Sequence, residues 1–374
     1  MKLKHYIFPV LFFFSLFVKA QDEEDIIYVF NNNDHVNTVE FSIDDRYIFY
    51  GTEDKLIKQW DLSSGEMIKE IEAHYGPVKD IKCLDDGVTI LSAGDKVIKS
   101  WNNLLEQQDY IWTHHTYVWS FDVNYENRKI ISGTYEKKPY IWDLYNQDLI
   151  DRPEAHEKSC LAVAFNYSGS LYATGSLDHY VFIWNSDKRE TEKAGVGHAE
   201  NIYDVEFTRD NKFLISVSKD KMVKIWEVST GGHYKTFTGH TDAVMCVSIH
   251  PESRFFVTGS MDGTIRLWDI KAGEGIYSFI NHEGPVNDVS FSHDGNYFAS
   301  ASNDNTVIIW KFPVSKISEY FFPEELEKEW SNDEIFQPKR KGESRTEYNE
   351  RSEKSSEKKR EIYLEYYQKV LNSK

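Results

Sequence analysis

Residues 239–269 read GHTDAVMCVSIHPESRFFVTGSMDGTIRLWD and contain short runs rich in β-branched and aromatic residues. These runs are Val244–Ile249, Phe255–Val257 and Thr264–Trp268. Turn-forming residues separate them, namely His250-Pro251-Glu252-Ser253 and Met261-Asp262-Gly263. Short apolar runs between Pro, Gly, Asp and Ser predict strands joined by tight turns, and not helices.

Trp268 is one of seven tryptophans that recur at nearly constant intervals, 41, 41, 42, 42, 42 and 42 residues apart. They are Trp60, Trp101, Trp142, Trp184, Trp226, Trp268 and Trp310. A repeat of about 40–45 residues made of short strands is typical of a β-propeller, in which each blade is a four-stranded sheet. The sequence therefore predicts an all-β fold, a seven-bladed β-propeller over residues 21–313.

These units resemble WD repeats, and Gly239-His240 through Trp268-Asp269 follow that family's pattern closely. The resemblance covers residues 25–312. It implies a hydrogen-bonded tetrad in each blade, formed by a His before the first strand, a Ser or Thr in the second, an Asp in the next turn and the Trp. The fourth to seventh blades carry complete sets: His156, Thr174, Asp178 and Trp184; His198, Ser216, Asp220 and Trp226; His240, Thr258, Asp262 and Trp268; His282, Ser300, Asp304 and Trp310.

The first three blades depart from this pattern. The third has His114, Ser132 and Trp142, with Glu136 in place of Asp as a longer carboxylate that is expected to reach the His. The second has His74, Ser92, Asp95 and Trp101, with one residue deleted ahead of the Asp. The first keeps Asp54 and Trp60 but has Asn32 and Tyr50 at the His and hydroxyl positions, which puts its tetrad in question.

His, Ser and Asp are also the members of a hydrolase triad. A triad occurs once in an active site, whereas this set recurs in most blades with a Trp indole as its fourth member. We therefore expect a buried structural network, in which an unpaired member would cost roughly 1–3 kcal/mol.

Residues Asp25–Phe30 form an apolar strand ahead of the first repeat. After Trp310 the chain reads Lys311-Phe312-Pro313 and then becomes charged, so the last blade lacks an outer strand of its own. An open ring would expose a sheet edge. We expect the N-terminal strand to become the outer strand of the seventh blade and to close the ring.

Residues 1–20 read as a signal peptide, with basic Lys2 and Lys4, an apolar stretch Tyr6–Val18 and a small-residue exit at Val18-Lys19-Ala20. Gln21 would be the mature N-terminus. The apolar stretch is shorter than the roughly 20 residues of a bilayer span, so no membrane span is expected after cleavage. The sequence predicts an exported chain, periplasmic or secreted; the alternative is a membrane tether through the uncleaved segment.

Residues 314–374 form a charged C-terminal tail. Its apolar clump, Glu319–Pro323 with Trp330, is expected to pack on the rim of the propeller. Ile362, Tyr363, Tyr366, Tyr367, Val370 and Leu371 recur at three- and four-residue intervals, which predicts a helix near residues 353–371.

The formal net charge of −18 disfavours nucleic acid as a partner, because a phosphate backbone would be repelled. The three cysteines, Cys83, Cys160 and Cys246, form no CxxC pair, and no Gly-rich phosphate loop or metal-ligand cluster stands outside the repeats. We therefore expect no cofactor, no metal and no catalysis. The predicted function is a monomeric ring that serves as a scaffold for other proteins.

Fold alone does not establish function. The alternatives are a propeller that binds a small ligand or a sugar, and an enzyme with its site in the central channel. A charged, buried residue that lines the channel outside the repeat register would favour these alternatives.

The repeat register also predicts where a partner binds. In propellers of this family the loops before each first strand and the turns before the tetrad Asp open on one face. Projecting positions there carry large apolar residues in the third to sixth blades and polar ones elsewhere. The predicted binding residues are Tyr117, Trp119, Tyr135, Leu161, Leu177, Tyr203, Lys219, Met245 and Met261. Exposed aromatic and Met side chains are typical anchors of protein interfaces. The alternative is that the tail's own apolar clump covers them.

Overall fold

The computed structural model describes residues 25–154, 156–188, 191–340 and 342–373. The predicted signal peptide, residues 1–20, and its cleavage site lie outside these residues. The described chain forms two compact units, one that ends at Lys311 and one over Phe312–Lys374.

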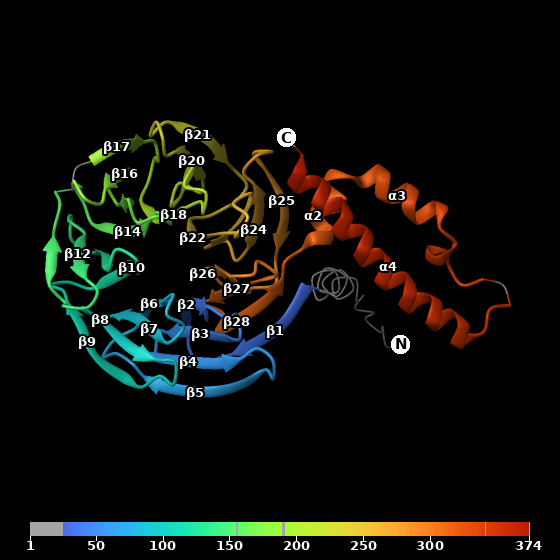
Figure 1. Cartoon of the computed structure of the whole chain (residues 1–374), viewed down its shortest axis with the longest axis horizontal. Coiled ribbons are helices and arrows are strands. Elements are labelled where there is room, and N and C mark those ends of the chain that lie inside the picture. Colours follow the sequence, from blue (N-terminus) through green and yellow to red (C-terminus); the bar gives the residue numbers. More distant parts are fainter. Residues whose placement is uncertain (1–24, 155, 189–190, 341, 374) are drawn as a thin grey trace, which may run out of the picture. The chain divides into compact units, whose positions relative to one another are not determined.

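The first unit contains seven four-stranded antiparallel sheets, arranged around a central opening (Figure 1). The first blade contains β2 (Val36–Phe41), β3 (Tyr47–Thr52), β4 (Leu56–Asp61) and β5 (Glu66–Glu72). The second contains β6 (Val78–Cys83), β7 (Thr89–Gly94), β8 (Val97–Asn102) and β9 (Gln107–Thr113). The third contains β10 (Val118–Asn124), β11 (Lys129–Thr134), β12 (Tyr140–Asp143) and β13 (Leu149–Asp151).

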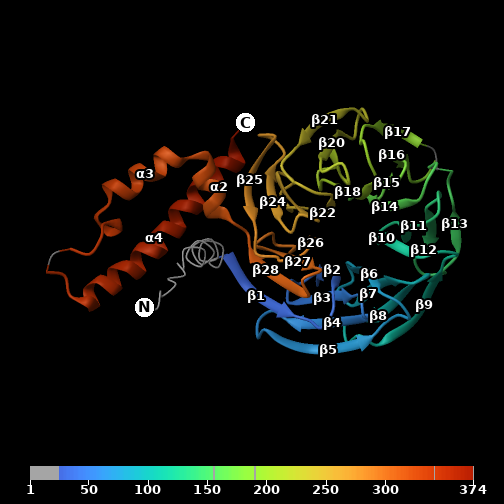
Figure 2. The same ribbon diagram turned by 180° about the vertical axis from the view of Figure 1, so that it is seen from behind.

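The remaining blades repeat this order, and the same ring is seen from behind in Figure 2. The fourth contains β14 (Cys160–Phe165), β15 (Leu171–Ser176), β16 (Tyr180–Asn185) and β17 (Thr191–Val196). The fifth contains β18 (Ile202–Phe207), β19 (Phe213–Ser218), β20 (Val223–Glu227) and β21 (His233–Phe237). The sixth contains β22 (Val244–Ile249), β23 (Phe255–Ser260), β24 (Ile265–Asp269) and β25 (Glu274–Phe279). The seven-bladed all-β fold predicted from the tryptophan repeat is confirmed.

The seventh blade is assembled from both ends of the first unit. It contains β26 (Val286–Phe291), β27 (Tyr297–Ser302), β28 (Thr306–Lys311) and, outermost, β1 (Ile26–Asn31). β1 pairs antiparallel with β28, with Phe30 opposite Val307. That the ring depends on this strand for closure stays a prediction.

The hydrophobic core lies between neighbouring blades. The second strand of each blade is buried almost along its whole length, because adjacent sheets cover both of its faces. Ile215 and Val217 of β19, for example, share one cluster with Val244 and Val247 of β22. This packing fixes each innermost strand at the wall of the central channel.

Each innermost strand shifts register once against its neighbour, as a β-bulge does, and always at the same place in the repeat. The shifted residues are Asn37, Lys79, Trp119, Leu161, Tyr203, Met245 and Asn287. A bulge leaves one residue out of the ladder and re-aims its side chain. The innermost strand of each blade therefore has one bulge residue, and these residues occupy equivalent places at the mouth of the channel.

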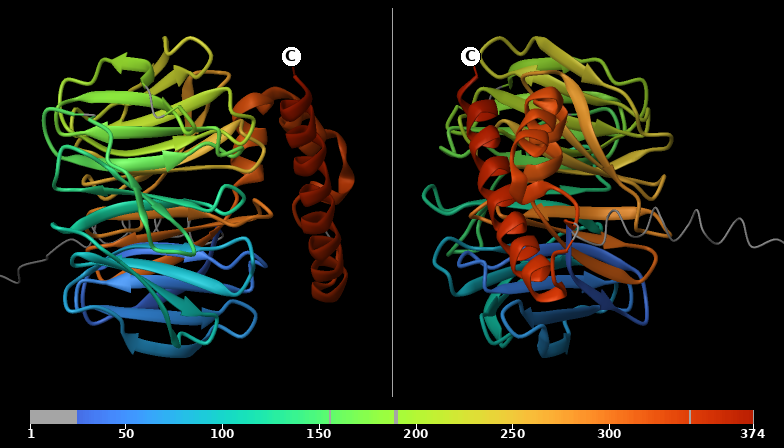
Figure 3. Two further views of the ribbon diagram at one scale, coloured as in Figure 1. Left: turned by 60° about the vertical axis from the view of Figure 1, so that its left-hand side comes forward. Right: turned by 90° about the vertical axis from the view of Figure 1, so that its right-hand side faces the viewer.

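The second unit contains α2 (Val314–Phe321), α3 (Pro323–Asn332), the 3₁₀ turn η2 (Glu334–Phe336) and α4 (Arg345–Asn372), and Figure 3 shows these helices side by side. Within this unit, Phe322 packs against Tyr366 with ring centroids 5.1 Å apart, and Trp330 lies 5.5 Å from Tyr363. The apolar clump expected to pack on the propeller rim thus has partners inside the tail itself.

α4 includes the predicted helix at residues 353–371 but begins further upstream, at Arg345. Its start is fixed by a capping box, in which Ser344 Oγ accepts from the Glu347 N–H at 3.2 Å and the Glu347 carboxylate accepts from the Ser344 N–H at 2.8 Å. The apolar stripe gave no indication of this start, because the first two turns are polar. No helix of the described residues has the length and apolar character of a membrane span.

Candidate functional site

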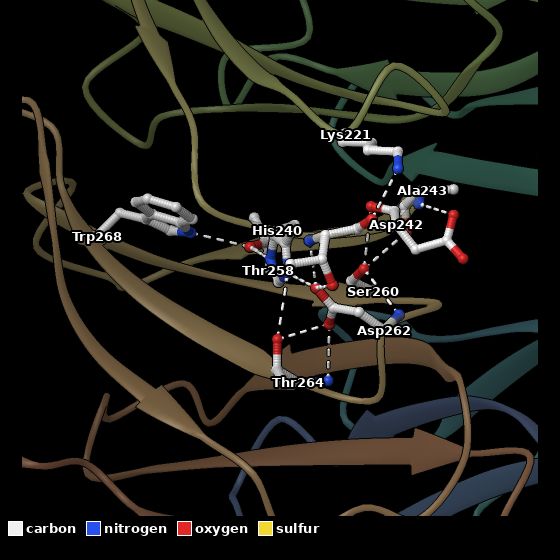
Figure 4. A network of polar contacts seen from close by, with 10 residues as sticks. Lys221, His240, Asp242, Ala243, Thr258, Ser260, Asp262, Thr264 and Trp268 are labelled. Carbon is white, nitrogen blue, oxygen red and sulfur yellow. Dashed lines mark hydrogen bonds and ion pairs between the residues drawn. The ribbon is translucent and has the colours of Figure 1, made fainter.

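The sixth blade shows the tetrad in full (Figure 4). Trp268 Nε1 donates to Thr258 Oγ1 at 2.9 Å, and the same hydroxyl lies 2.8 Å from His240 Nε2. His240 Nδ1 lies 3.1 Å from the Asp262 carboxylate. An indole N–H can only donate and an ionised carboxylate can only accept. The hydroxyl therefore donates to Nε2, and His240 donates to Asp262 through Nδ1–H.

The fourth, fifth and seventh blades repeat this chain with their predicted residues. The Trp-to-hydroxyl distances are 2.9, 2.8 and 2.8 Å, and the His-to-Asp distances are 3.0, 2.9 and 2.8 Å. Burial raises the pKa of Asp178 and Asp220, but the hydrogen bonds and charge of His156 and His198 and the bonds from backbone N–H groups together outweigh it and hold both pKa values at about 2. The four Asp side chains are thus ionised acceptors.

The second and third blades lack the His-to-carboxylate bond. His74 and His114 bond Ser92 and Ser132 at 2.8 and 2.7 Å, but their Nδ1 atoms have no partner. The expectation that Glu136 reaches His114 is wrong. Its carboxylate pairs instead with Arg152 and accepts from the Tyr140 hydroxyl. Burial is the main cause that lowers the pKa, to about 3 for His74 and about 4 for His114, because neither imidazole has a carboxylate partner.

The first blade replaces the tetrad with larger side chains. Trp60 Nε1 donates to the Tyr50 hydroxyl at 2.8 Å, and that hydroxyl donates to Asn32 Oδ1 at 2.9 Å. The Tyr50 hydroxyl thus replaces the Ser or Thr hydroxyl of the other blades, and Asn32 replaces their His. The tetrads and their substitutes lie inside the blades; the four His side chains bonded to Asp are at most 1% exposed. They have no open face on which a substrate could meet them.

The predicted binding residues are largely accessible. Tyr117, Tyr135 and Met261 are 54%, 49% and 44% exposed. Lys219 is exposed, and Trp119, Leu177, Tyr203 and Met245 are half-buried. The Trp119 ring lies edge-on to Tyr135, with centroids 5.8 Å apart. We call Tyr117, Trp119, Tyr135, Tyr203, Met245 and Met261 the rim arc.

Leu161 does not belong to this surface, although its register position is equivalent to that of Trp119 and Tyr203. It is 3% exposed. Its carbonyl accepts from Ser120 Oγ at 2.5 Å, and a Cβ on Gly133 would lie only 2.3 Å from the same oxygen. The third blade thus packs tightly against the bulge of β14, and the Leu161 side chain is buried. The expectation that Leu161 projects is wrong.

On the other side of the mouth, the equivalent positions are polar and tied to neighbouring blades. Asn37 Nδ2 donates to Glu53 and to the Val78 carbonyl, both at 3.0 Å. Asn287 Nδ2 donates to Asn303 and to the Val36 carbonyl, both at 2.7 Å. These side chains are engaged within the ring, whereas Tyr117, Tyr135 and Met261 of the rim arc are exposed.

The central channel encloses a cavity of about 470 Å³. Trp119, Tyr203 and Met245 line it together with six carboxylates of the innermost strands: Glu40, Asp80, Asp122, Asp204, Glu206 and Asp288. Lys82 of β6 lies among them. No group of three or more His, Cys, Asp or Glu suited to a metal ion occurs in the part of the chain that the structure describes.

Four of these carboxylates link adjacent blades. Each accepts a hydrogen bond from a backbone N–H on the innermost strand of the next blade: Asp80 from Phe121 at 2.8 Å, Asp122 from Phe165 at 2.6 Å, Asp204 from Val247 at 3.0 Å and Asp288 from Val39 at 2.9 Å. Burial raises the pKa of Asp80 to about 8, of Asp204 to about 7 and of Asp288 to about 6.

The channel carboxylates were missed from the sequence. Their pattern is nevertheless visible, because Asp80 and Lys82, or Asp204 and Glu206, stand two residues apart in strands whose alternate residues share a face. Lys82 and Glu206 occupy the same repeat position as Glu40 and Asp122, so they do not lie outside the register.

Comparison with known proteins agrees with this architecture. The model of the family described as WD domain, G-beta repeat matches residues 25–61, 65–102, 148–185, 191–227, 231–269 and 273–311. Residues 103–147, between two of these matches, include Tyr117, Trp119 and Tyr135 of the rim arc.

Several curated proteins are similar over part of the chain. The ribosome biogenesis protein YTM1 of Candida glabrata is 25% identical over 141 residues, 32% of this chain and 30% of that protein. The WD repeat domain-containing protein 83 homolog of Dictyostelium discoideum is 26% identical over 121 residues, 32% and 37% respectively. The serine-threonine kinase receptor-associated protein of Mus musculus is 38% identical over 69 residues, 18% and 20%. The chain thus matches at most 37% of the length of these relatives. By its seven blades, its tetrads and the family match over most of its repeats, the chain belongs to the WD-repeat family.

Proposed function

We propose that the chain is a non-catalytic scaffold that binds other proteins through the rim arc. The observation that carries this proposal is the grouping of aromatic and Met side chains on one side of the channel mouth, with Tyr117, Tyr135 and Met261 strongly exposed. Large exposed aromatic residues are the usual anchors of protein interfaces. Names of relatives that refer to ribosome biogenesis or to association with a receptor support a role in protein assemblies.

The test is capture of partner proteins by the mature chain and by a Trp119→Ala, Tyr203→Ala variant. Loss of specific capture with an unchanged melting temperature is expected. The matched control is Tyr180→Ala, Tyr234→Ala, which removes two tyrosines, 40% and 45% exposed, from β16 and β21. Equal capture by both variants would place the interface elsewhere, and a large fall in stability of the first would assign Trp119 and Tyr203 to the core.

We also propose that the chain acts outside the cytoplasm after removal of residues 1–20. The basic start, the short apolar stretch and the exit at Ala20 support this. The mass of the exported protein should correspond to a chain that starts at Gln21. A mass that retains Met1 would indicate the membrane tether instead.

A further inference from the structure

One position of the repeat, two residues before the tetrad Trp, differs in the seventh blade from the other six. It lies on the strand that carries the Trp, and six blades have a long basic or aromatic side chain there: Lys58, Lys99, Tyr140, Phe182, Lys224 and Arg266. The seventh blade has Ile308, which is uncharged and shorter than any of these. The space that a long side chain occupies in the other blades is therefore not filled by this residue.

In two blades the basic side chain at this position binds the backbone just before the tetrad His. Lys99 Nζ donates to the Ala73 carbonyl at 2.7 Å, and Lys224 Nζ donates to the Gly197 carbonyl. Ala73 and Gly197 directly precede the His of their blades. Hydrogen bonds from a charged donor are stronger than those between neutral groups. The repeat thus provides, just before its His, a place that accepts an ammonium group.

The seventh blade has a cavity of about 470 Å³ beside Ile308, which we call the seventh-blade pocket. It is distinct from the central channel, because no described residue lines both. Its apolar side is formed by Ile26 and Val29 of β1 and by Ile308 of β28. Its polar side includes Asn281, Glu283 and Asp304.

The polar side of the pocket has an unused acceptor and no basic side chain. Asn281 directly precedes His282, so it occupies the place of the residues that accept the two lysine ammonium groups. Its Oδ1 atom is buried and has no hydrogen-bond partner in the described part of the chain. Glu283 is exposed, and none of the described residues that line the pocket is basic. A cation that enters the pocket would therefore compete with no lysine or arginine of the pocket wall.

Asp304 adds a negative charge to the same side. Burial raises its pKa, but the hydrogen bond and charge of His282, together with bonds from Thr306 and the Glu283 N–H, outweigh this effect and leave the pKa well below its ordinary value. The carboxylate is therefore ionised at neutral pH. Its oxygens already accept these hydrogen bonds, so it attracts a cation through its charge, whereas Asn281 and Glu283 offer acceptor oxygens.

We propose that the seventh-blade pocket binds a primary ammonium group at the end of an alkyl chain. The ammonium group takes the place that lysine side chains of the protein itself take in the second and fifth blades, beside Asn281 and Glu283. The alkyl chain packs on Ile26, Val29 and Ile308, because burial of apolar surface favours binding. A lysine side chain of another protein and a free diamine share this chemistry. The pocket contains no residue of the rim arc, so this inference goes beyond the proposed function and does not depend on it.

The test is a ligand-observed NMR titration of the full mature chain with three probes. Nα-acetyl-lysine methylamide represents a lysine side chain, cadaverine represents a free diamine, and Nα-acetyl-norleucine methylamide has the alkyl chain without the ammonium group. Two variants are compared with the parent. Glu283→Gln removes a charge and keeps an acceptor oxygen, and Ile308→Lys places an ammonium group of the protein itself in the pocket. The control Ile68→Lys adds the same charge on β5, at a residue that is 51% exposed.

At least one of the two amines should bind the parent and Ile68→Lys equally, and the norleucine derivative should bind at least about tenfold more weakly than that amine, because it lacks the charged donor. Ile308→Lys should lose the binding, since its own ammonium group occupies the site, and Glu283→Gln should weaken it. Binding of the lysine derivative alone assigns the site to a protein ligand, and binding of cadaverine alone assigns it to a free diamine.

Three results would overturn this inference: neither amine binds, the norleucine derivative binds as well as the amines, or Ile308→Lys binds as the parent does. If Ile308→Lys does not fold, Glu283→Gln decides, and parental affinity of that variant then overturns the inference. The capture of partners through Trp119 and Tyr203 is measured separately, so its failure would leave this result unchanged.

Discussion

The carboxylate of Asp288, in the seventh blade, accepts a hydrogen bond at 2.9 Å from the backbone nitrogen of Val39, in the first. This bond links the last innermost strand of the ring to the first. The same carboxyl group is half-buried, and desolvation raises its pKa to about 6, so its ionised form is less stable in the native state than in water. The bond stabilises the ring junction, whereas the charge on Asp288 weakens it.

These two effects make opposite predictions for two substitutions. Asp288→Ala removes the acceptor and should lower the free energy of unfolding by about 1–3 kcal/mol, because the Val39 N–H loses its partner. Asp288→Asn keeps an acceptor oxygen and removes the charge, so at pH 8 it should be at least as stable as the parent. Urea unfolding measures both. If Asp288→Asn is as destabilising as Asp288→Ala at pH 8, the charge on Asp288 itself stabilises the ring.

The second prediction concerns β1. Deletion of residues 21–30 removes the outer strand of the seventh blade and the packing of Phe30 on Trp60, whose ring centroids are 4.2 Å apart. The edge of β28 would then be unpaired. We expect a broad thermal transition in place of a cooperative one. Differential scanning calorimetry measures this transition. A truncated chain that melts as the parent does would show that the ring closes without this strand.

The third prediction is that stability falls as the pH rises from about 6.5 to 8. Below pH 6.5 two effects oppose each other. The unfolded chain protonates His74 and His114, which stay neutral in the native state down to about pH 3 and 4, whereas the native state keeps protons on Asp80 and Asp204 that the unfolded chain loses above about pH 4. Asp80 and Asp204 have native pKa values of about 8 and 7. Between pH 6.5 and 8 the native state keeps protons that the unfolded chain has already lost, so stability falls as the pH rises.

Urea unfolding at intervals from pH 6.5 to 9 measures this decline. Asp80→Asn should flatten the decline above pH 6.5, because it removes one of the groups that titrate there. A curve that rises steadily from pH 6.5 to 8 in the parent would contradict the assignment of raised pKa values to the channel.

Most of the ring could be predicted because its determinants are local. The tryptophan interval and the alternation of apolar runs with turn residues define the blades, and the four full tetrads follow from fixed spacing within one repeat. The predictions that were wrong concern residues that contact another blade or that pair with a side chain outside the tetrad. Leu161 is covered through contacts with Ser120 and Gly133 of another blade, and Glu136 pairs with Arg152, the residue that follows the outer strand of its own blade. No spacing inside one repeat encodes these neighbours.

The fourth prediction concerns the substitute network of the first blade. Tyr50→Phe keeps the ring but removes the hydroxyl that joins Trp60 and Asn32. Because the Trp60 indole N–H then has no acceptor there, the free energy of unfolding should fall by about 1–3 kcal/mol. Chemical denaturation with Trp fluorescence measures this. The exposed-tyrosine variant Tyr167→Phe is the control and should match the parent; equal stability of both variants would mean that the Tyr50 hydroxyl contributes nothing.

The last prediction separates the tail from the ring. The aromatic residues of the second unit contact one another: Phe312 lies 6.0 Å from Tyr367, Phe322 lies 5.1 Å from Tyr366 and Trp330 lies 4.8 Å from Phe336. α4 has its own capping box, and Arg351 pairs with Glu343 at 2.8 Å. Because these interactions begin and end within residues 312–374, a chain that ends at Lys311 should keep the melting temperature of the parent within a few degrees. Tyr366→Ala in the full chain should likewise leave the main transition unchanged while it lowers the helical circular dichroism signal. A truncated chain that no longer unfolds cooperatively would show that the ring requires the tail.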